Sequence, residues 1–192
     1  MLDFSKTNNI IKVLQYFYTG DEFMSKIPIF VSCPTDLNDN QEKQRNTIIK
    51  FLDELNMEAI ALGRSDYPKD YPLKEIYVLA KHCAGGIILG FEQTYIETCI
   101  TKRGTMHESK ISQPISLPTP WNHIEAGILF GLKLPLLIFK EPTINGGIFD
   151  YGNTDLYVHT MPNASLNSSE YKELKQVFLK WHGVVTSIYY EY

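Results

Sequence analysis

The chain has 192 residues, of which 44% are apolar and 21% are charged, and its net charge is −4. These values predict one globular domain with a core of its own. The negative charge argues against duplex nucleic acid as a partner. No apolar run approaches the ~20 residues of a membrane span, so we expect no membrane association.

Cysteine and histidine usage bears on the compartment and on metal chemistry. The chain has an odd number of cysteines, with no paired spacing: Cys33, Cys83 and Cys99. This argues against a disulfide framework. The N-terminus lacks the pattern of a signal peptide, so we expect a cytoplasmic protein. The histidines and cysteines show no metal-ligand spacing, and we expect neither a metal nor a cofactor.

The sequence divides into an N-terminal extension, residues 1–26, and a domain, residues 27–192. Apolar residues between Ile10 and Tyr18 recur at helical spacing and predict a short amphipathic helix. We expect this helix to dock on the domain or on a second subunit.

Short apolar runs alternate with helical patterns throughout the domain. This alternation predicts an α/β fold, a five-stranded parallel sheet covered by helices on both faces. The expected strand order is the flavodoxin-like 2-1-3-4-5, which makes a three-layer sandwich. The predicted strands are 27–32, 57–62, 85–90, 134–139 and 156–160, and the predicted helices are 39–55, 73–82, one from residue 120 and one from about residue 168.

Several helix starts are predicted from capping residues. Asp39, with Glu42 three residues later, resembles a capping box. Thr119 is the expected cap of the helix that begins at the following proline. Ser168 or Ser169 is the expected cap of the last helix.

The segment 91–118 has no clear secondary structure. Residues 93–100 are compatible with a short helix or a strand, and residues 102–114 have an exposed composition. Connections of this length within a compact domain are commonly functional or flexible, and this one is also a candidate for docking a neighbouring molecule.

The helix from Pro120 to Leu132 is apolar nearly all round and carries one formal charge, Glu125. This pattern predicts a buried helix. Burying an unpaired carboxylate costs several kcal/mol, roughly, so Glu125 has either a structural partner or a function. The structural alternative is a carboxylate that accepts hydrogen bonds from backbone or asparagine groups.

Topology predicts where a ligand would bind. In such a sheet, ligands bind beyond the carboxyl ends of the strands where the strand order switches, here between strands one and three. Polar and aromatic residues from four loops should converge there. The candidate substrate-binding residues are Ser32, Cys33, Pro34, Arg64, Asp66, Gly90, Phe91, Trp121 and Asn122, with Glu125 as the candidate catalytic residue.

These groups suit a nucleotide. Trp121 or Phe91 could stack a base, and Asn122 and Ser32 could orient ribose hydroxyls. A carboxylate beneath the sugar stabilises or attacks the positive charge that develops when an N-glycosidic bond breaks. The structural alternatives are that Ser32 and Pro34 only shape a turn and that Trp121 is a core aromatic.

Other chemistries have weaker signals. Cys33 lies near a helix start, where a thiol can become nucleophilic, but no histidine is obviously placed as its partner. The sequence has no G-x-G-x-x-G after the first strand and no Walker A motif, which argues against a dinucleotide dehydrogenase and a P-loop ATPase.

Two segments resemble a known family. Val31–Thr35 (Val-Ser-Cys-Pro-Thr) and Glu125–Pro135 (Glu-Ala-Gly-Ile-Leu-Phe-Gly-Leu-Lys-Leu-Pro) are similar to the nucleoside 2-deoxyribosyltransferase-like group and, more distantly, to Toll/interleukin-receptor (TIR) domains. The similarity covers roughly residues 27–160. It implies that Glu125 acts as a nucleophile on ribose, because the transferases and the TIR enzymes that cleave NAD use a helix glutamate in this way.

Together these patterns predict cleavage or transfer of the bond between ribose and base in NAD or another nucleotide, with Glu125 as the catalytic carboxylate. The resemblance also implies a context in bacterial antiphage defence, with a homo-oligomer or a defence-system partner. The alternatives are a non-catalytic module that binds a nucleotide or a signal, and an assembly adaptor that docks neighbours through residues 1–26 and 91–118.

Overall fold

The computed structural model describes residues 25–61, 71–152 and 158–191. The predicted N-terminal helix, Arg64 and Asp66 lie outside these ranges. Within them, no helix combines the length and the apolar character needed to cross a bilayer.

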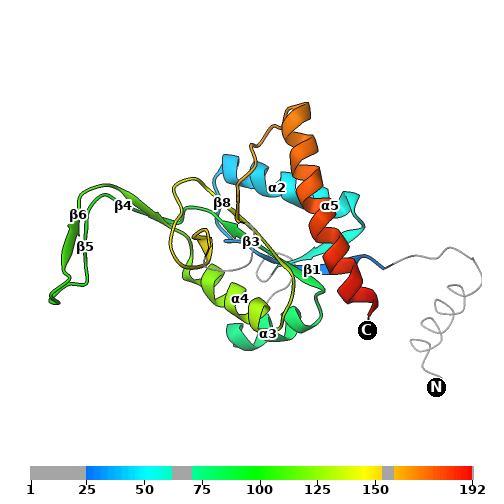
Figure 1. The fold of residues 1–192 in the computed structure, drawn as a ribbon, viewed down its shortest axis with the longest axis horizontal. Helices are drawn as coiled ribbons and strands as arrows, with labels where there is room; N and C mark the ends of the chain where they lie inside the picture. Colours follow the sequence, from blue (N-terminus) through cyan, green and yellow to red (C-terminus); the bar gives the residue numbers. More distant parts are fainter. Residues whose placement is uncertain (1–24, 62–70, 153–157, 192) are drawn as a thin grey trace, which may run out of the picture.

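A five-stranded parallel sheet forms the centre of the molecule (Figure 1). Its order is β2-β1-β3-β8-β9, which confirms the predicted 2-1-3-4-5 arrangement. The first and third strands have the predicted bounds, whereas the second ends earlier and the fourth begins and ends later than predicted. The described part of the fifth strand begins at Val158, and the predicted residues 156 and 157 lie outside the described ranges. The strands are β1 (Ile27–Ser32), β2 (Met57–Ile60), β3 (Gly85–Gly90), β8 (Leu136–Lys140) and β9 (Val158–Thr160).

Four helices cover the two faces of this sheet. Two pack on one face, α2 (Asp39–Glu54) and α5 (Ser168–Tyr190), and two on the other, α3 (Pro72–Lys81) and α4 (Pro120–Gly131). A short 3-10 helix, η1 (Gly147–Phe149), lies in the loop between β8 and β9. The result is the predicted three-layer α/β sandwich.

Two of the predicted caps are wrong. The cap of α2 is Asn38, whose side chain accepts from the backbone N–H groups of Asn40 and Gln41. The cap of α5 is Asn167. In each case an asparagine one or two residues upstream completes a capping box with the residue three positions later. The predicted Thr119 cap of α4 is confirmed.

The pleat of β1 determines which residues face each helix layer. Ile29 and Val31 belong to the core shared with α2 and α5, whereas Phe30 belongs to the core shared with α3 and α4. Because side chains alternate along a strand, Ser32 falls on the α3–α4 side, at the carboxyl end of β1.

The prediction that α4 is buried all round is wrong. Asn122, Glu125, Ala126 and Leu129 face the protein, but the opposite side is open to solvent. The exposed apolar side chains of α4 outside this buried stripe are Trp121 (42%), Ile124 (42%) and Phe130 (63%). The sheet covers only one side of a helix in the outer layer, whatever the composition of the other side.

The segment after β3 forms a projecting two-stranded ribbon, residues 94–117, here called the β-arm (Figure 1). Its strands are β4 (Thr94–Ile96), β5 (Cys99–Thr101), β6 (Ser109–Ile111) and β7 (Ile115–Leu117), and β4 pairs with β7 and β5 with β6, both antiparallel. Ile96 pairs with Ile115 and Cys99 with Ile111. Between these two pairs the outgoing strand advances three residues (96 to 99), whereas the return strand spans four (111 to 115). The extra residue on the return strand forms a β-bulge.

Candidate functional site

Three polar side chains meet on the α4 side of the sheet, at the carboxyl end of β1. Ser32 ends β1, while Asn122 and Glu125 lie three residues apart on the buried side of α4. Thr119 caps α4 and so fixes where its first turn begins. The exposed fractions are 1% for Ser32, 0% for Asn122 and 9% for Glu125.

These side chains form a hydrogen-bonded chain. The Asn122 amide Nδ2 donates to Ser32 Oγ at 2.7 Å, and the Ser32 hydroxyl hydrogen-bonds the Glu125 carboxyl group. Since Ser32 Oγ accepts from Asn122, its own hydrogen is available to donate to an ionised Glu125. Asn122 thereby positions the hydroxyl that holds the carboxylate.

The Glu125 carboxyl group has an unusual acidity. Burial raises its pKa from 4.5 to about 7, and the hydrogen bond from Ser32 opposes this shift. A buried acid that titrates near neutral pH is characteristic of functional carboxylates. At pH 7, Glu125 is therefore divided between its neutral and ionised forms.

We predict that Ser32→Ala lowers the free energy of unfolding by ~1–3 kcal/mol, because the buried Nδ2 of Asn122 loses its acceptor. Asn122→Ala should also destabilise, and the double variant should cost less than the sum of the single variants by ~0.5–3 kcal/mol. Urea denaturation of the wild type, the two single variants and the double variant forms a double-mutant cycle and measures the coupling between Ser32 and Asn122. Ser187→Ala on the exposed side of α5 is the control, and additive effects of the two site substitutions would contradict the contact.

The loop after β8 packs over the same end of the sheet. A Cβ atom on Gly147 would lie 2.9 Å from the His123 ring, and the His123 and Phe149 rings meet edge to face with centroids 5.4 Å apart. Burial lowers the pKa of His123, which favours its neutral imidazole. Phe149 is fully buried above Gly90, which explains why β3 ends in a residue without a side chain.

We predict that Gly90→Ala destabilises the fold by ~1–3 kcal/mol through overpacking. The added Cβ would lie 2.5 Å from Phe149 Cε1. The matched control is Gly183→Ala on α5, where a Cβ meets nothing within 4 Å and alanine favours the helix. Thermal unfolding compares the two, and equal stability of Gly90→Ala and wild type would contradict the close packing. Phe149→Leu should partly rescue Gly90→Ala.

A second polar group at this edge was missed by the sequence analysis. Glu141, directly after β8, accepts from the backbone N–H of Glu92 at 2.5 Å and from Gln41 Nε2 at 3.2 Å. Ser116 at the base of the β-arm donates to Glu92. These contacts tie the root of the arm to the ends of β3 and β8. The position of Glu141 two residues after the predicted strand 134–139 was the signal that could have indicated it.

Lys140 was also missed. It is 5% exposed, and its ammonium donates to the Ile144 carbonyl at 2.8 Å and to Asn145 Oδ1 at 2.9 Å. Its ammonium also lies 5.1 Å from the centroid of the Tyr151 ring. Lys140 thus holds the loop that leads into η1.

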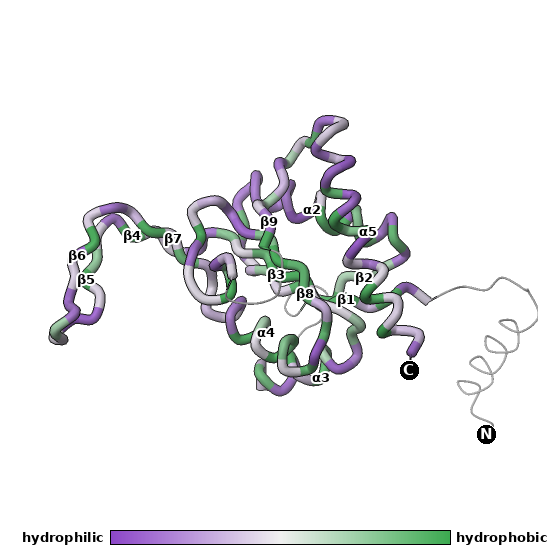
Figure 2. The backbone as a smooth tube through the Cα atoms, viewed as in Figure 1, coloured by the Kyte–Doolittle hydropathy of each residue, from purple (hydrophilic) through white to green (hydrophobic). Residues whose placement is uncertain are grey.

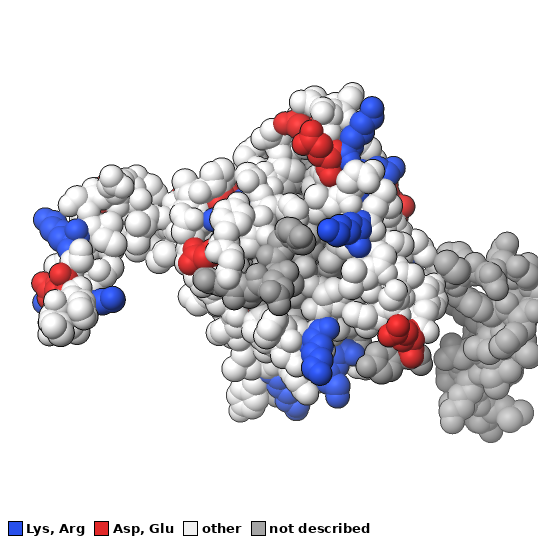
Figure 3. Space-filling view, viewed as in Figure 1, with Lys and Arg blue, Asp and Glu red and all other residues white. Residues whose placement is uncertain are grey.

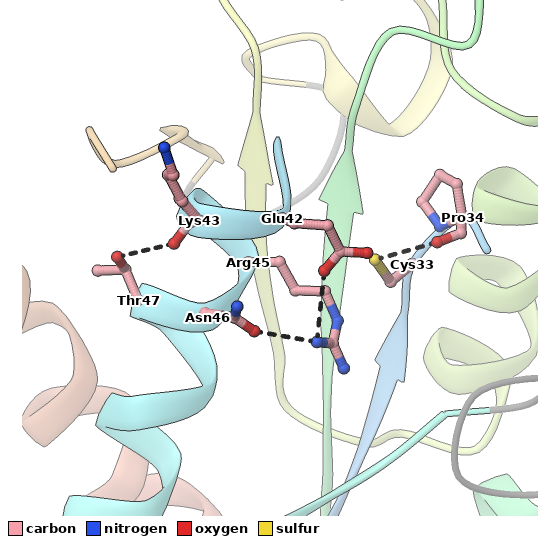
Figure 4. Close-up of polar contacts among 7 residues, drawn as sticks. All are labelled: Cys33, Pro34, Glu42, Lys43, Arg45, Asn46 and Thr47. Atoms are coloured by element: carbon pink, nitrogen blue, oxygen red, sulfur yellow. Dashed lines mark hydrogen bonds and ion pairs between the residues drawn. The ribbon is translucent and has the colours of Figure 1, made fainter. Parts of the chain in front are cut away.

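The loop after β1 contains two further predicted residues, Cys33 and Pro34. The Cys33 thiol donates to the Pro34 carbonyl at 3.5 Å, and Figure 4 draws this loop with the first turns of α2, where Arg45 and Glu42 form an ion pair at 3.8 Å. A thiol that donates its hydrogen to a carbonyl is not arranged as the thiolate that a nucleophile requires. Cys33, Cys83 and Cys99 form no disulfide with one another.

Of the two predicted stacking residues, only Trp121 is accessible. Trp121 lies in the first turn of α4, four residues before Glu125. Phe91 is 0% exposed and belongs to the core on the α2–α5 side of the sheet, so it does not join Glu125 because the pleat turns it to the opposite face.

Among the residues that the structure describes, no three or more His, Cys, Asp or Glu side chains are grouped to hold a metal ion. Comparison with known proteins adds no assignment: no family model, no curated protein and no solved structure matches this chain.

Proposed function

We propose that this protein cleaves the N-glycosidic bond between ribose and base in a nucleotide or nucleoside, with NAD as the first candidate substrate and Glu125 as the catalytic carboxylate. The observation that carries this proposal is the state of Glu125: nearly buried, held by Ser32, with a pKa of about 7, at the strand-order switch. The resemblance of Glu125–Pro135 to nucleoside 2-deoxyribosyltransferases supports the choice of bond.

In the proposed reaction the ionised Glu125 attacks C1′ of the ribose. The bond from C1′ to the base nitrogen breaks, its electron pair leaves with the base, and a ribosyl ester forms on Glu125. Water then hydrolyses the ester, or a second base accepts the ribose. Nicotinamide leaves NAD as a neutral molecule, so this substrate requires no proton donor for its leaving group, whereas a purine or pyrimidine does.

The neighbouring groups have supporting roles in this proposal. Ser32 orients the carboxylate, Asn122 orients Ser32, and Trp121, one turn before Glu125 on α4, offers a face for stacking the base. A cationic nicotinamide ring close to Glu125 would favour the ionised carboxylate and lower its pKa. NAD would therefore help to generate the nucleophile that attacks it.

The test is incubation of the purified full chain with NAD, ribonucleosides, 2′-deoxyribonucleosides and nucleoside monophosphates, followed by chromatographic detection of released base. We expect base release from at least one of these classes. Addition of a second, isotopically labelled base distinguishes transfer from hydrolysis. No release from any class, with or without an acceptor, would contradict the proposal.

A second candidate function is recognition of a nucleotide without turnover. It is favoured by the pKa of Glu125, because a carboxyl group that is half neutral at pH 7 can both donate to and accept from a ligand. Calorimetric titration with the same compounds tests it. Binding of an intact nucleotide that is weakened at least tenfold in Glu125→Gln, with no base released, would identify a binding module.

A further inference from the structure

The β-arm carries apolar side chains that the domain does not cover. Tyr95, Ile100 and Met106 are 58%, 52% and 92% exposed. Figure 1 shows the arm extending away from the sheet and its helices, and Figure 2 shows hydrophobic segments along β5 and β6. An isolated two-stranded ribbon is at best marginally stable in water. Packing against another surface would therefore stabilise the arm.

A second uncovered apolar surface lies on the outward side of α3 and α4, which pack side by side on one face of the sheet. On α4 this side carries no charge, because the only charged residue of that helix is the buried Glu125. We call this surface the α3–α4 face. Its exposed apolar side chains are Leu73 (52%), Tyr77 (47%), Val78 (45%), Ile124 (42%) and Phe130 (63%).

The area of these two surfaces matches that of a stable protein interface. At ~150–250 Å² per aromatic side chain, the exposed fractions of Tyr77, Tyr95 and Phe130 offer roughly 250–420 Å² per molecule. The aliphatic side chains of both surfaces raise this to about the ~800 Å² that each partner contributes to a standard interface. Each of the two surfaces by itself approaches the ~300–600 Å² of the largest apolar patch on a typical monomer, which is often functional.

We propose that the β-arm of one molecule packs on the α3–α4 face of a second copy of this chain, reciprocally, in a two-fold dimer. The two uncovered surfaces belong to the same chain, and the arm extends away from its own body, so they can cover each other only between molecules. The exposed Leu117 (39%) ends the arm three residues before α4 begins, so the arm leaves the body next to the start of α4. Two-fold symmetry closes the assembly at two molecules.

The distribution of charge agrees with contact between identical copies. The outward side of α4 is uncharged, so two copies can approach it without like-charge repulsion or the desolvation of an ion. Most charged residues of the arm lie in its outer half, among them Lys102, Arg103 and Glu108, where Figure 3 shows both signs together. This places charge at the rim of the proposed contact and apolar side chains at its centre.

The test is sedimentation velocity of the full chain over concentrations of roughly 1–100 μM, a range in which dimers of standard interface size are populated. We expect a dimer for wild type. Replacing residues 97–114 with Asn-Gly, a two-residue hairpin loop between the opposed Ile96 and Ile115, should weaken the dimer at least 100-fold, as should Ile124→Glu. Val184→Glu, at a 51% exposed position on α5, is the matched control and should remain dimeric.

A mixing experiment separates arm-to-face contact from other dimers. The arm-truncated variant retains its face, and Ile124→Glu retains its arm, so an equimolar mixture should form a heterodimer with one of the two contacts. Circular dichroism establishes that each variant is folded. A monomeric wild type, a dimer that survives arm truncation, equal loss in Val184→Glu, or folded variants that do not associate in the mixture would each overturn the proposal.

Discussion

Replacement of Glu125 by Gln will abolish base release, with kcat falling on the order of 10³-fold or more. Gln has the shape of Glu and can keep the hydrogen bond with Ser32, but it has no negative charge with which to attack C1′ or to stabilise the cation that forms there. The loss should appear in kcat with little change in KM, since the charge matters most in the transition state.

The measurement is the initial rate of base release for Glu125→Gln and for Glu97→Gln, which changes an exposed carboxylate on the β-arm. The control should retain the wild-type rate. The pH dependence adds an independent readout: if Glu125 must be ionised, kcat/KM of wild type rises with pH through about 7, the pKa of the free protein. Substrate loss that is equal in wild type and Glu125→Gln would remove Glu125 from the mechanism.

The same substitution will stabilise the fold at alkaline pH, by about 3 kcal/mol at pH 8. The pKa of Glu125 is raised from 4.5 to about 7 on folding, and each pKa unit corresponds to ~1.4 kcal/mol. Because the folded state holds this proton more tightly than the unfolded state, the contribution of Glu125 to stability falls as pH rises from 4.5 to 7 and is then constant. Gln carries no charge and avoids this cost.

Urea denaturation at pH 5 and pH 8 measures the effect. At pH 5 the two proteins should differ by less than ~1 kcal/mol, because Glu125 is then neutral in the folded state. Glu97→Gln should show no such pH-dependent gain. A Glu125→Gln protein less stable than wild type at pH 8 would indicate that the carboxylate is satisfied by its surroundings and serves the fold. A gain in stability together with lost activity would instead be the trade-off typical of active sites.

The sheet could be predicted from the sequence because its signal is local. The runs Ile27–Ser32 and Gly85–Gly90 are short, apolar and bounded by polar or turn-forming residues, and their observed bounds are those predicted. The strand order followed from handedness rules that apply to all such chains. Ser32 lies at the carboxyl end of β1, which is where the topology of such sheets predicts the site.

The wrong predictions concern features that depend on contacts between segments, such as the start of α2 and the packing of Phe91. The cap of α2 shifted from Asp39 to Asn38 because either side chain can accept the same backbone donors, and the final choice depends on how the loop leaves β1. Phe91 was placed in the site by its position after β3, but it packs in the core on the other face. Neither the capping residue of α2 nor the face on which Phe91 packs can be predicted from the residues next to it in the sequence.

The sequence by itself determined the α/β class, the strand order, and the presence of one carboxylate on an apolar helix, because periodicity and composition act within single segments. Only the tertiary structure decided that Asn122 reaches Ser32 across 90 positions of sequence, that α4 buries one side and exposes the other, and that residues 94–117 form an arm. These features depend on contacts between segments that are distant in the chain, because such contacts set the burial, the hydrogen bonds and the pKa of Glu125.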